Sequence, residues 1–526
     1  MKLPRDLKER FERAKRHKDN WFDLWDDVYE YVLPQRENIY GEHSPGDHKN
    51  EDKTYDATAR VSLIRLANRI QGAIVPPGSK WFSLEASENV DENAKDEVNE
   101  RLQENTDTIF KFINRSNFNV EINESLLELG IGTGALAIED TGDPKTPLRF
   151  KAVPITELYL EEGPWNTVET TFREYRTSVA NCQRQYVEGM GGKLDDTRME
   201  TLRDRPGTKM TVVEMMVYNP EREYWDFYVV DYVKEFIMVH ETFSSNPYVV
   251  FRWLKSPEEM YGRGPAIQAL PDIRTANRIA QLELVNSAFG TYGVHTYDAA
   301  EGAISNQIRI EPRALIDIPN GSNLQPLEVG GNYQITQLSL ERVQDQIKQT
   351  MFADRLPPPT GQVHTATELE IRQRELYQDI GASATRLEHE LVIPVVKRVK
   401  DILARYNHVD PVEINGDLVD VVIKSPISID TEEADKTVNY LQTILSIIPP
   451  EIAAQEIDLS EAVQYLGERL GVSREIFLSD EDKQALQEQQ QQQQQEQGAL
   501  DQGQQAAEIA NKLGVSAGDL EGLVNE

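Results

Sequence analysis

Apolar residues in the N-terminal part of the chain recur at steps of three or four, which is the spacing of one buried helix face. The helices predicted in this way are 5–33, 57–75, 120–129, and one whose buried side carries Val98, Leu102, Ile109 and Ile113. From Ala135 to Val250 the pattern changes to short β-branched and aromatic runs bounded by Gly, Pro and Asp, which predict strands. These runs are Ala135–Ile138, Arg149–Val153, Thr170–Thr177, Thr211–Tyr218, Trp225–Tyr232 and Glu235–Val239. We therefore expect an α+β N-terminal half with antiparallel pairing.

A helix, a short connecting segment and a second helix follow this strand-rich region. The first helix is predicted over about 263–290, with apolar residues at helical spacing from Ala266 to Leu284. Residues 291–335 contain short-strand and turn patterns. We expect the two helices that flank this connecting segment to lie side by side.

The most unusual unit is a helix, a proline-rich loop and a longer helix over 336–394. Its first helix ends before the three prolines 357–359, which forbid the helical hydrogen-bond ladder. The stretch Thr365-Ala-Thr-Glu368 is a capping box that starts the second helix. The apolar stripe of that helix continues to Pro394, and Gly381 within it is where we expect a bend.

Beyond Pro394 the pattern predicts a helix over 395–406 and a short strand pair at Val419–Ile423. Capping boxes at Asp430 and Asp458 predict two more helices. Residues 484–505 are dominated by glutamine, a composition that buries nothing. The expected fold class of the chain is α+β and mainly helical.

The net charge of −34 is the strongest signal in the composition. A protein that grips DNA neutralises phosphates with Lys and Arg, and this chain as a whole does not. Two interpretations remain open: the protein does not meet nucleic acid, or it lies close to DNA without binding it tightly. Basic residues from Lys8 to Lys18 alternate with acidic ones, so we interpret this helix as a solvated face with i,i+4 ion pairs rather than a nucleic-acid arm.

Cysteine content and hydropathy indicate where the protein is made. Cys182 is the single cysteine, so no internal disulfide can form and intracellular synthesis is expected. The chain lacks the run of about 18 apolar residues that a membrane span needs. Residues 1–6 lack the apolar core of a signal peptide. We expect no membrane contact.

No stretch has the order of elements that a nucleotide site needs. Gly130-Ile-Gly-Thr-Gly134 follows a helix and precedes a strand, the reverse of a dinucleotide loop, so we interpret it as a tight turn that needs positive φ. Gly72–Lys80 departs from P-loop spacing and also precedes a strand. Two histidines within residues 43–48 lack further metal ligands at suitable spacing, and Cys182 has no histidine nearby. We therefore predict no catalytic, cofactor-binding or metal-binding residues.

Several short motifs occur in a fixed order along the chain. They are Leu66–Pro76 followed by Trp81, Pro247-Tyr248 with Arg252, Tyr261-Gly-Arg263, Thr365–Arg372, and Leu387–Val395. In this order and spacing the chain resembles the portal, or head-to-tail connector, proteins of short-tailed (podovirus-type) bacteriophages. The resemblance covers about residues 5–497, including the glutamine-rich tail.

The resemblance implies a ring, usually of twelve subunits, with a wing, a stem of paired helices, a clip and a crown. The implied segments are 1–262 (wing), 263–290 (first stem helix), 291–335 (clip), 336–355 (second stem helix), 356–364 (tunnel loop), 365–394 (long helix between wing and crown), 395–480 (crown) and 481–526 (glutamine-rich acidic tail).

The implied function is a non-enzymatic channel for double-stranded DNA at one capsid vertex, used in packaging and ejection, with no cofactor. The implied partners are the terminase motor, the major capsid and scaffolding proteins, tail adaptor or nozzle proteins, and internal core proteins. Such a protein is part of the virion and is made in the cytoplasm of a bacterial host. The alternatives are another structural component, such as a scaffold or tail-tube protein, or an enzyme of DNA packaging.

The resemblance also implies which residues face DNA. A ring of acidic subunits would repel phosphates and let DNA slide without a deep binding minimum. The implied tunnel-loop residues are Arg355, Pro357, Pro358, Pro359, Thr360, Gly361 and His364. Their three prolines favour a stiff loop that constrains DNA by shape more than by charge. Candidates for a basic ring in the channel are Lys397, Arg398 and Lys400, with an outward-facing solvated cluster as the alternative.

Overall fold

A computed structural model of the chain describes residues 2–36, 54–78, 80–87, 92–164, 166–292, 295–297, 315–317, 325–326, 333–353, 380–381, 383–409, 413–414, 417–418 and 421–424. All of them belong to the first of two units into which the chain divides, residues 1–428. Among the helices in these ranges, none combines the length and the apolar character that a membrane crossing requires.

Helices dominate the N-terminal part, as predicted. They are α1 (Arg5–Asp19), α2 (Phe22–Val32), the short 3₁₀ helix η1 (Pro34–Arg36), α3 (Thr58–Ile74), α4 (Glu92–Arg115) and α5 (Phe118–Ile131). The prediction of one helix over 5–33 is wrong, because the chain breaks between α1 and α2. The two halves bury their aromatic residues in different places: Phe11 packs against Tyr159, whereas Trp25 packs against Tyr261.

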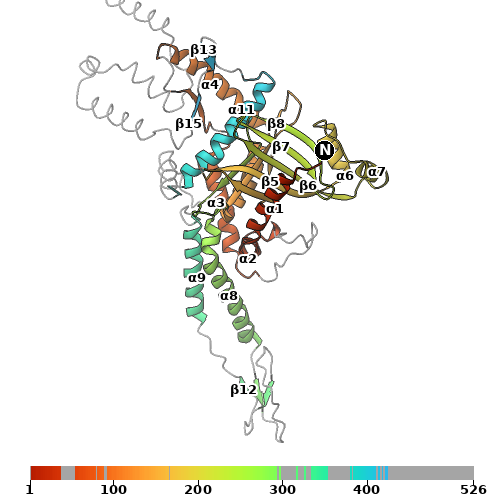
Figure 1. Ribbon diagram of the computed structural model, residues 1–526. Helices are drawn as coiled ribbons and strands as arrows, with labels where there is room; N and C mark the ends of the chain where they lie inside the picture. The colour runs from red at the N-terminus through yellow and green to blue at the C-terminus, as the bar shows by residue number, and fades with distance from the viewer. Residues whose placement is uncertain are drawn as a thin grey trace, which may run out of the picture. The chain divides into compact units, whose positions relative to one another are not determined.

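Two antiparallel sheets follow, which confirms the α+β expectation (Figure 1). The five-stranded sheet has the order β4 (Leu158–Glu162), β5 (Val168–Ser178), β6 (Lys209–Asn219), β7 (Tyr224–Asp231), β8 (Phe236–Phe243). The three-stranded sheet has the order β3 (Leu148–Ala152), β2 (Thr133–Asp140), β9 (Tyr248–Arg252). Short helical pieces between the strands are η3 (Ile155–Glu157), α6 (Val179–Cys182), the π-helix η4 (Gln183–Glu188) and α7 (Asp196–Asp204).

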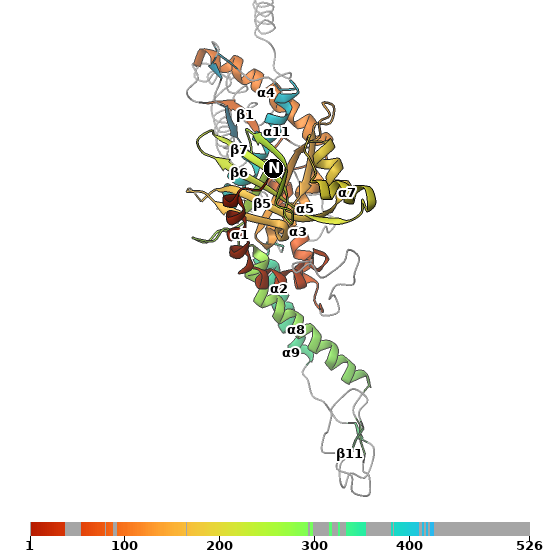
Figure 2. The same cartoon turned by 45° about the vertical axis from the view of Figure 1, so that its right-hand side comes forward.

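The predicted pair of helices is present. Helices α8 (Pro265–Tyr292) and α9 (Tyr333–Thr350) lie side by side and run in opposite directions (Figures 1 and 2). The described strands between them form a small sheet with the order β11 (Leu315–Asp317), β10 (His295–Tyr297), β12 (Gln325–Pro326). Residues before α3 join the two helices, since the backbone N–H of Tyr55 donates to Asn277 of α8 and Gln344 of α9 donates to Asp56.

The helix predicted to end at Pro394 continues past it. A π-helical turn, η5 (Glu388–Val392), leads directly into α11 (Ile393–Arg405), and Pro394 lies in the first turn of α11. A proline clashes with the carbonyl group four residues earlier in a regular helix, and a π turn opens the helix at that point. Gly381, where we expected a bend, adopts φ +31°, outside the helical range.

The buried side of this helix also requires the π turn. Buried positions recur every four residues, at Ala384, Glu388, Val392 and Val396. A regular helix has 3.6 residues per turn, so over three turns such a row would rotate away from the core by about a third of a turn. The additional residue in the π turn removes this drift and keeps the whole row buried.

Strand β15 (Val421–Lys424) pairs with β1 (Ser83–Ala86), more than 300 residues earlier in the chain. The sequence predicted a strand pair within 419–423, and this is wrong because the partner of β15 comes from the N-terminal half. The nearby local hairpin is formed by β13 (Glu413–Ile414) and β14 (Asp417–Leu418).

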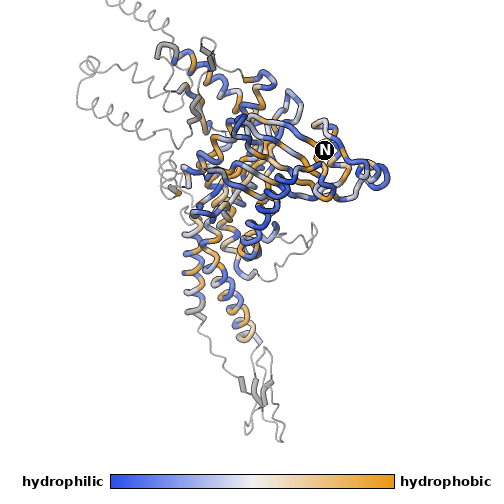
Figure 3. Tube along the Cα trace, in the orientation of Figure 1, coloured by the Kyte–Doolittle hydropathy of each residue, from blue (hydrophilic) through white to orange (hydrophobic). Residues whose placement is uncertain are grey.

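One apolar cluster joins distant parts of the chain. It contains residues of α3, α4 and α5, residues of β2 and β9, and the segment 380–409. A second cluster contains α2, both sheets, the start of α8 and the end of α9. Figure 3 shows the corresponding alternation of hydrophobic and hydrophilic positions along these elements. The segments before and after 354–379 are therefore both packed into the body of the protein.

Candidate functional site

The predicted tunnel-loop residues lie outside the described residues. These are Arg355, Pro357, Pro358, Pro359, Thr360, Gly361 and His364. The structure describes the residues on either side, up to Ala353 and again from Ile380. We call these the entry end and the return end of the segment 354–379. The entry end contacts Trp253, and the return end contacts both Arg252 and Trp253.

The entry end is a helix cap with an aromatic residue in an unusual conformation. Helix α9 ends in a Schellman motif, in which the N–H of Ala353 donates to Lys348 O (2.7 Å) and the N–H of Phe352 donates to Gln349 O (3.0 Å). Phe352 occupies the position that glycine usually takes, with φ +53°. The left-handed conformation costs a residue with a side chain about 1 kcal/mol or more.

Contacts of Phe352 offset this cost. Its ring lies against Trp253, with the ring centroids 5.8 Å apart, and it packs on the apolar cluster that contains α3 and α5. Its carbonyl group accepts a hydrogen bond from the guanidinium of Arg69. Next to it Met351 is fully buried. The chain direction at the end of α9 is therefore fixed by side chains from two other elements.

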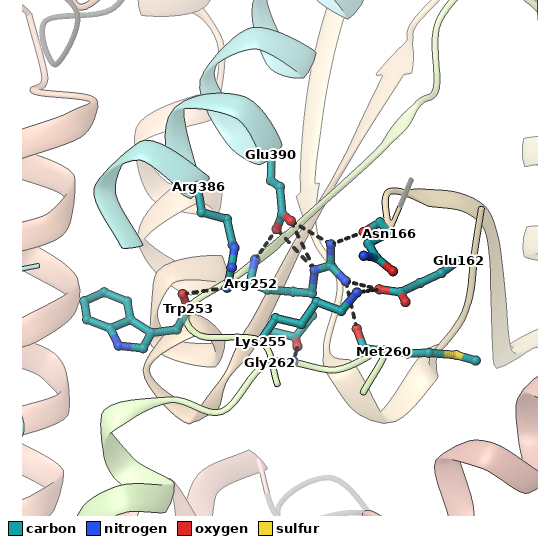
Figure 4. A network of polar contacts seen from close by, with 10 residues as sticks. Glu162, Asn166, Arg252, Trp253, Lys255, Met260, Gly262, Arg386 and Glu390 are labelled. Carbon is teal, nitrogen blue, oxygen red and sulfur yellow. Dashed lines mark hydrogen bonds and ion pairs between the residues drawn. The ribbon is translucent and has the colours of Figure 1, made fainter. Parts of the chain in front are cut away.

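The return end is held by a buried ion pair (Figure 4). Glu390 uses both carboxylate oxygens on Arg252: Oε2 accepts from the backbone N–H at 2.8 Å, and Oε1 accepts from Nη2 at 2.7 Å. One turn earlier, Arg386 donates to the carbonyl oxygen of Trp253 at 3.4 Å. Between them, Leu387 is fully buried. This end of the segment is therefore tied to both Arg252 and Trp253.

Arg252 is 2% exposed and has further partners besides Glu390. It contacts Glu162 and donates to the carbonyl oxygens of Asn166 (3.0 Å) and Met260 (3.3 Å). Lys255 also pairs with Glu162, at 2.6 Å. We call Arg252, Lys255, Glu162 and Glu390 the Arg252 cluster. It contains two cationic and two anionic side chains, so its charge is balanced.

The charged form of Arg252 is strongly favoured. Burial alone would lower its pKa, but the hydrogen bonds and charges of Glu390 and Glu162 outweigh this and leave the pKa raised above its ordinary value. A buried charge that loses one partner becomes costly, so the geometry of Glu390 is coupled to that of Arg252.

Close contact between glycines fixes the backbone just before the start of α8. The backbone of Gly132 packs so tightly against Gly262, and Gly130 against Gly264, that a Cβ atom on Gly132, Gly262 or Gly264 would collide with backbone. We predicted that the Gly130–Gly134 turn needs positive φ. This is wrong for Gly132, which has an extended φ of 163°. Glycine is required here for the close approach of two backbones.

One of the three basic channel candidates does not face solvent. Arg398 is 2% exposed, its guanidinium lies 4.7 Å from the ring centre of Phe243, and it donates to Ser245 O at 3.3 Å. Burial lowers its pKa to about 10. The prediction of Arg398 as a DNA-facing residue is therefore wrong. Lys397 is exposed and Lys400 is half-buried, and their role stays a prediction.

The basic N-terminal helix binds the protein's own sheet. Arg10 and Arg13 both pair with Glu161, Lys8 pairs with Glu235 and Lys15 with Glu174. The predicted i,i+4 pairing is seen only for Arg5 and Glu9 among the ion pairs described for this helix. The buried Lys18 donates to the carbonyl of Thr156 at 2.6 Å. These charges hold α1 on the acidic face of the sheet, a role that the alternation of charges in sequence did not indicate.

Other predicted or excluded sites can now be placed. Cys182 is buried against Met238, and burial raises the pKa of its thiol to about 12, which disfavours the reactive thiolate. His43 and His48 lie outside the described residues. Within the described ranges, no three His, Cys, Asp or Glu side chains gather closely enough to hold a metal ion.

Residues 5–478 match the family described as "Bacteriophage head to tail connecting protein". A "Probable portal protein" of Bordetella phage BPP-1 is 22% identical over 502 residues, which is 90% of this chain and 88% of that protein. A "Portal protein" of Salmonella phage epsilon15 is 22% identical over 541 residues, covering 96% of this chain and 94% of that protein. The solved structure titled "Virion of native gene transfer agent (GTA) particle" is similar at 11% identity and a TM-score of 0.32, covering 79% of this chain and 92% of that chain, a score too low to support a structural argument.

The family match includes the helix pair, the Arg252 cluster and both ends of the segment 354–379. It confirms the resemblance noted in the sequence. It also confirms that the protein is a structural connector of the virion and not an enzyme. The chain belongs to the family of bacteriophage head to tail connecting proteins, and its function is that of a portal in a phage virion.

Proposed function

We propose that copies of this chain form a ring, with twelve subunits as the expected number, whose central channel carries double-stranded DNA during packaging and ejection. In this proposal residues 1–262 form the wing, α8 and α9 the stem, and the described strands between them part of the clip. The segment 356–364 is the tunnel loop, 365–394 the long helix, 395–480 the crown and 481–526 the acidic tail.

The observation that carries this proposal is the exposed apolar surface on the distal half of α8. As far as Ala280 most of its apolar residues are buried and Ile267 and Ile279 are half-buried, but beyond that point Leu282 is 44% exposed, Leu284 57% and Val285 43%. These residues point in different directions around the helix. A helix that is apolar on several sides is normally covered by other elements. Neighbouring copies of the same stem would cover it, and this supports a ring.

The net charge of −34 supports passage of DNA in preference to tight binding. Each phosphate contact made by a protein steepens its affinity for DNA, so an acidic channel would leave DNA free to slide. In this proposal the tunnel-loop prolines narrow the channel by shape. The energy for translocation comes from a terminase motor docked at the ring, and the clip and wing later bind tail adaptor proteins and the capsid.

Electron microscopy of the purified protein tests the ring directly. We expect rings with a central hole; globules or filaments without a hole would refute the proposal. The double variant Leu284→Asp with Val285→Asp should abolish rings while leaving the fold intact, because both side chains are exposed in the single chain. Val233→Asp is the matched control, since Val233 is 68% exposed but lies in the turn between β7 and β8.

Replacement of residues 357–361 by a flexible Gly/Ser linker tests the loop. We expect rings to form and packaging or retention of DNA to fall. Unchanged phage yield would remove the loop from the proposal. The alternative of a scaffolding protein, expected to be largely helical, is disfavoured by the two antiparallel sheets.

A further inference from the structure

Arg252 and Trp253 lie where three segments of the chain meet. Arg252 ends β9 and Trp253 follows it directly. The C-terminal end of α9 reaches Trp253 through Phe352, and the helix around η5 reaches both residues through Arg386 and Glu390. We propose that Arg252 and Trp253 are positioning residues, which fix the entry and the return of the segment 354–379 relative to each other. This inference rests on the proposed function insofar as that segment carries the tunnel loop.

The entry contact fixes a direction as well as a position. A glycine in place of Phe352 would complete the Schellman motif with less strain, so the motif alone does not explain a phenylalanine. The ring of Phe352 instead places the end of α9 against Trp253, 5.8 Å between centroids. The left-handed backbone at Phe352, with φ +53°, is thus combined with an anchor that only a side chain can provide.

The return contact fixes the rotation of the helix. A carboxylate that bonds one group can pivot, but Glu390 bonds both the backbone N–H and the guanidinium of Arg252. Arg386 adds a third bond one turn away, to the carbonyl of Trp253. Figure 4 shows Arg386 and Glu390 on one side of their helix, directed at the two neighbouring residues. Rotation of this helix would break all three bonds together.

The π turn η5 directs the side chain of Glu390 toward Arg252. Leu387, three residues before Glu390, and Leu391, directly after it, are both buried in the core. The wider turn over Glu388–Val392 keeps the buried rows before and after it aligned while Glu390 faces Arg252. Such turns often occur where an exact side-chain direction matters for function.

A purely structural ion pair would look different. Arg173 is as buried as Arg252, at 2% exposure, and pairs with Glu157 and Glu214. Its ion-pair partners belong to η3 and β6, within the sheet region, and neither lies on the elements that carry the described ends of 354–379. Arg173 therefore provides a matched control: an equally buried arginine whose loss should not affect the two ends of that segment.

The test compares Arg252→Lys, Glu390→Gln and Arg173→Lys in the full-length ring by hydrogen–deuterium exchange. Lysine keeps the charge but cannot make the two-pronged contact, and glutamine keeps the shape without the charge. We expect exchange in peptides covering 345–353 and 383–392 to rise about tenfold in Arg252→Lys and Glu390→Gln, and to stay unchanged in Arg173→Lys. Unchanged exchange at both ends in the two cluster variants would overturn the inference.

The entry contact needs its own variant. Trp253→Leu removes the ring that faces Phe352, and we expect faster exchange in 345–353 with rings still formed. If in every variant exchange becomes faster in peptide 383–392 but not in peptide 345–353, the two ends are held independently and the inference is wrong.

Packaging separates this inference from the proposed function. For variants that form rings, the length of packaged DNA is measured by gel electrophoresis of virion genomes. Altered exchange with altered or lost packaging supports both statements. Altered exchange with normal packaging supports the positioning role and refutes the tunnel-loop role of 354–379.

Discussion

Arg173 and Arg252, two of the buried arginines in the described part of the chain, differ in what they connect. Arg173 lies among the strands, where Glu214 also accepts hydrogen bonds from the hydroxyl groups of Tyr186 and Tyr248. Arg252 connects the end of a strand to a helix 138 residues later. The contacts of Arg173 stabilise one sheet region. The contacts of Arg252 instead fix the helix around η5 relative to the end of β9.

Charge balance distinguishes the clusters as well. The Arg252 cluster has two cations and two anions, with Lys255 sharing Glu162. The Arg173 cluster has one arginine for Glu157 and Glu214. The nearby Glu139 is affected by the negative charge of Glu214 and by the positive charges of Lys151, Arg173 and Arg149. The comparison shows that equal burial of an arginine does not imply an equal role.

The largest expected effect is that of removing either arginine. Arg173→Met and Arg252→Met should each lower the free energy of unfolding by about 3–5 kcal/mol, because a buried carboxylate loses its partner. Urea denaturation followed by circular dichroism measures this. A loss below about 1 kcal/mol for either would show that water replaces the missing charge and that the site is less closed than its 2% exposure indicates.

Two substitutions of Phe352 separate the contribution of its ring from the cost of its left-handed backbone. Both Phe352→Ala and Phe352→Gly lose the contact with Trp253, but only alanine keeps the cost of a left-handed backbone. We expect the glycine variant to be about 1 kcal/mol more stable than the alanine variant, the reverse of their order inside a helix. Thermal unfolding of the two proteins measures the difference. Equal stability would mean that the backbone relaxes when the ring is removed.

Glu139, next to the Arg173 cluster, should make stability depend on pH. Burial, and then the charge of Glu214, raise the pKa of Glu139 above its ordinary value of 4.5. The folded protein therefore binds this proton more tightly than the unfolded chain, so stability falls as pH rises from 4.5 through the raised pKa. Glu139→Gln should flatten this fall, as measured by unfolding temperature between pH 4 and 7.

The smallest expected effect is that of Pro394→Ala. If proline alone caused the π turn, alanine would restore a regular helix and shift the residues before it. Burial of each Leu or Val side chain contributes about 1.5–3 kcal/mol, so the several buried residues on this helix outweigh the preference of one position. We expect the π turn and the Arg252 contacts to persist, with a stability change under about 1 kcal/mol. Exchange in peptide 383–392 checks this, and a large increase would assign the turn to the proline.

Much of the fold was predictable from short-range patterns. The helices over 57–75 and 263–290 and the strands β2, β3, β5, β6, β7 and β8 follow from apolar spacing within each element, whereas β4 and β9 were not among the predicted runs. Errors occurred where a distant contact decided the outcome. The helix over 5–33 is divided because its halves pack in different clusters, and β15 pairs with a strand from the N-terminal half.

The contacts of Arg252 and Trp253 with the two ends of the segment 354–379 had weaker signals in the sequence. Arg252 is a charged residue inside the apolar run Tyr248–Leu254, which already indicates a buried and paired cation. Nothing near it identifies Glu390 as the partner. The four-residue recurrence of apolar positions at Leu387, Leu391, Val395 and Val399 was a usable sign of the π turn. Arg398 belongs to the same helix, and its burial follows from the aromatic ring of Phe243, which local pattern does not reveal.

The sequence by itself determined the family, the type of most elements, the acidic character and the order of the helix pair and the proline-rich segment. These depend on residue composition and on interactions between neighbours in the chain, such as periodic burial and helix capping. Only the tertiary structure decided that Arg252 and Trp253 hold both ends of the segment 354–379, and that the N-terminal cations bind the sheet. Those outcomes depend on which distant groups can satisfy a buried charge or cover an aromatic ring, and such partners are chosen by the packing of the whole fold.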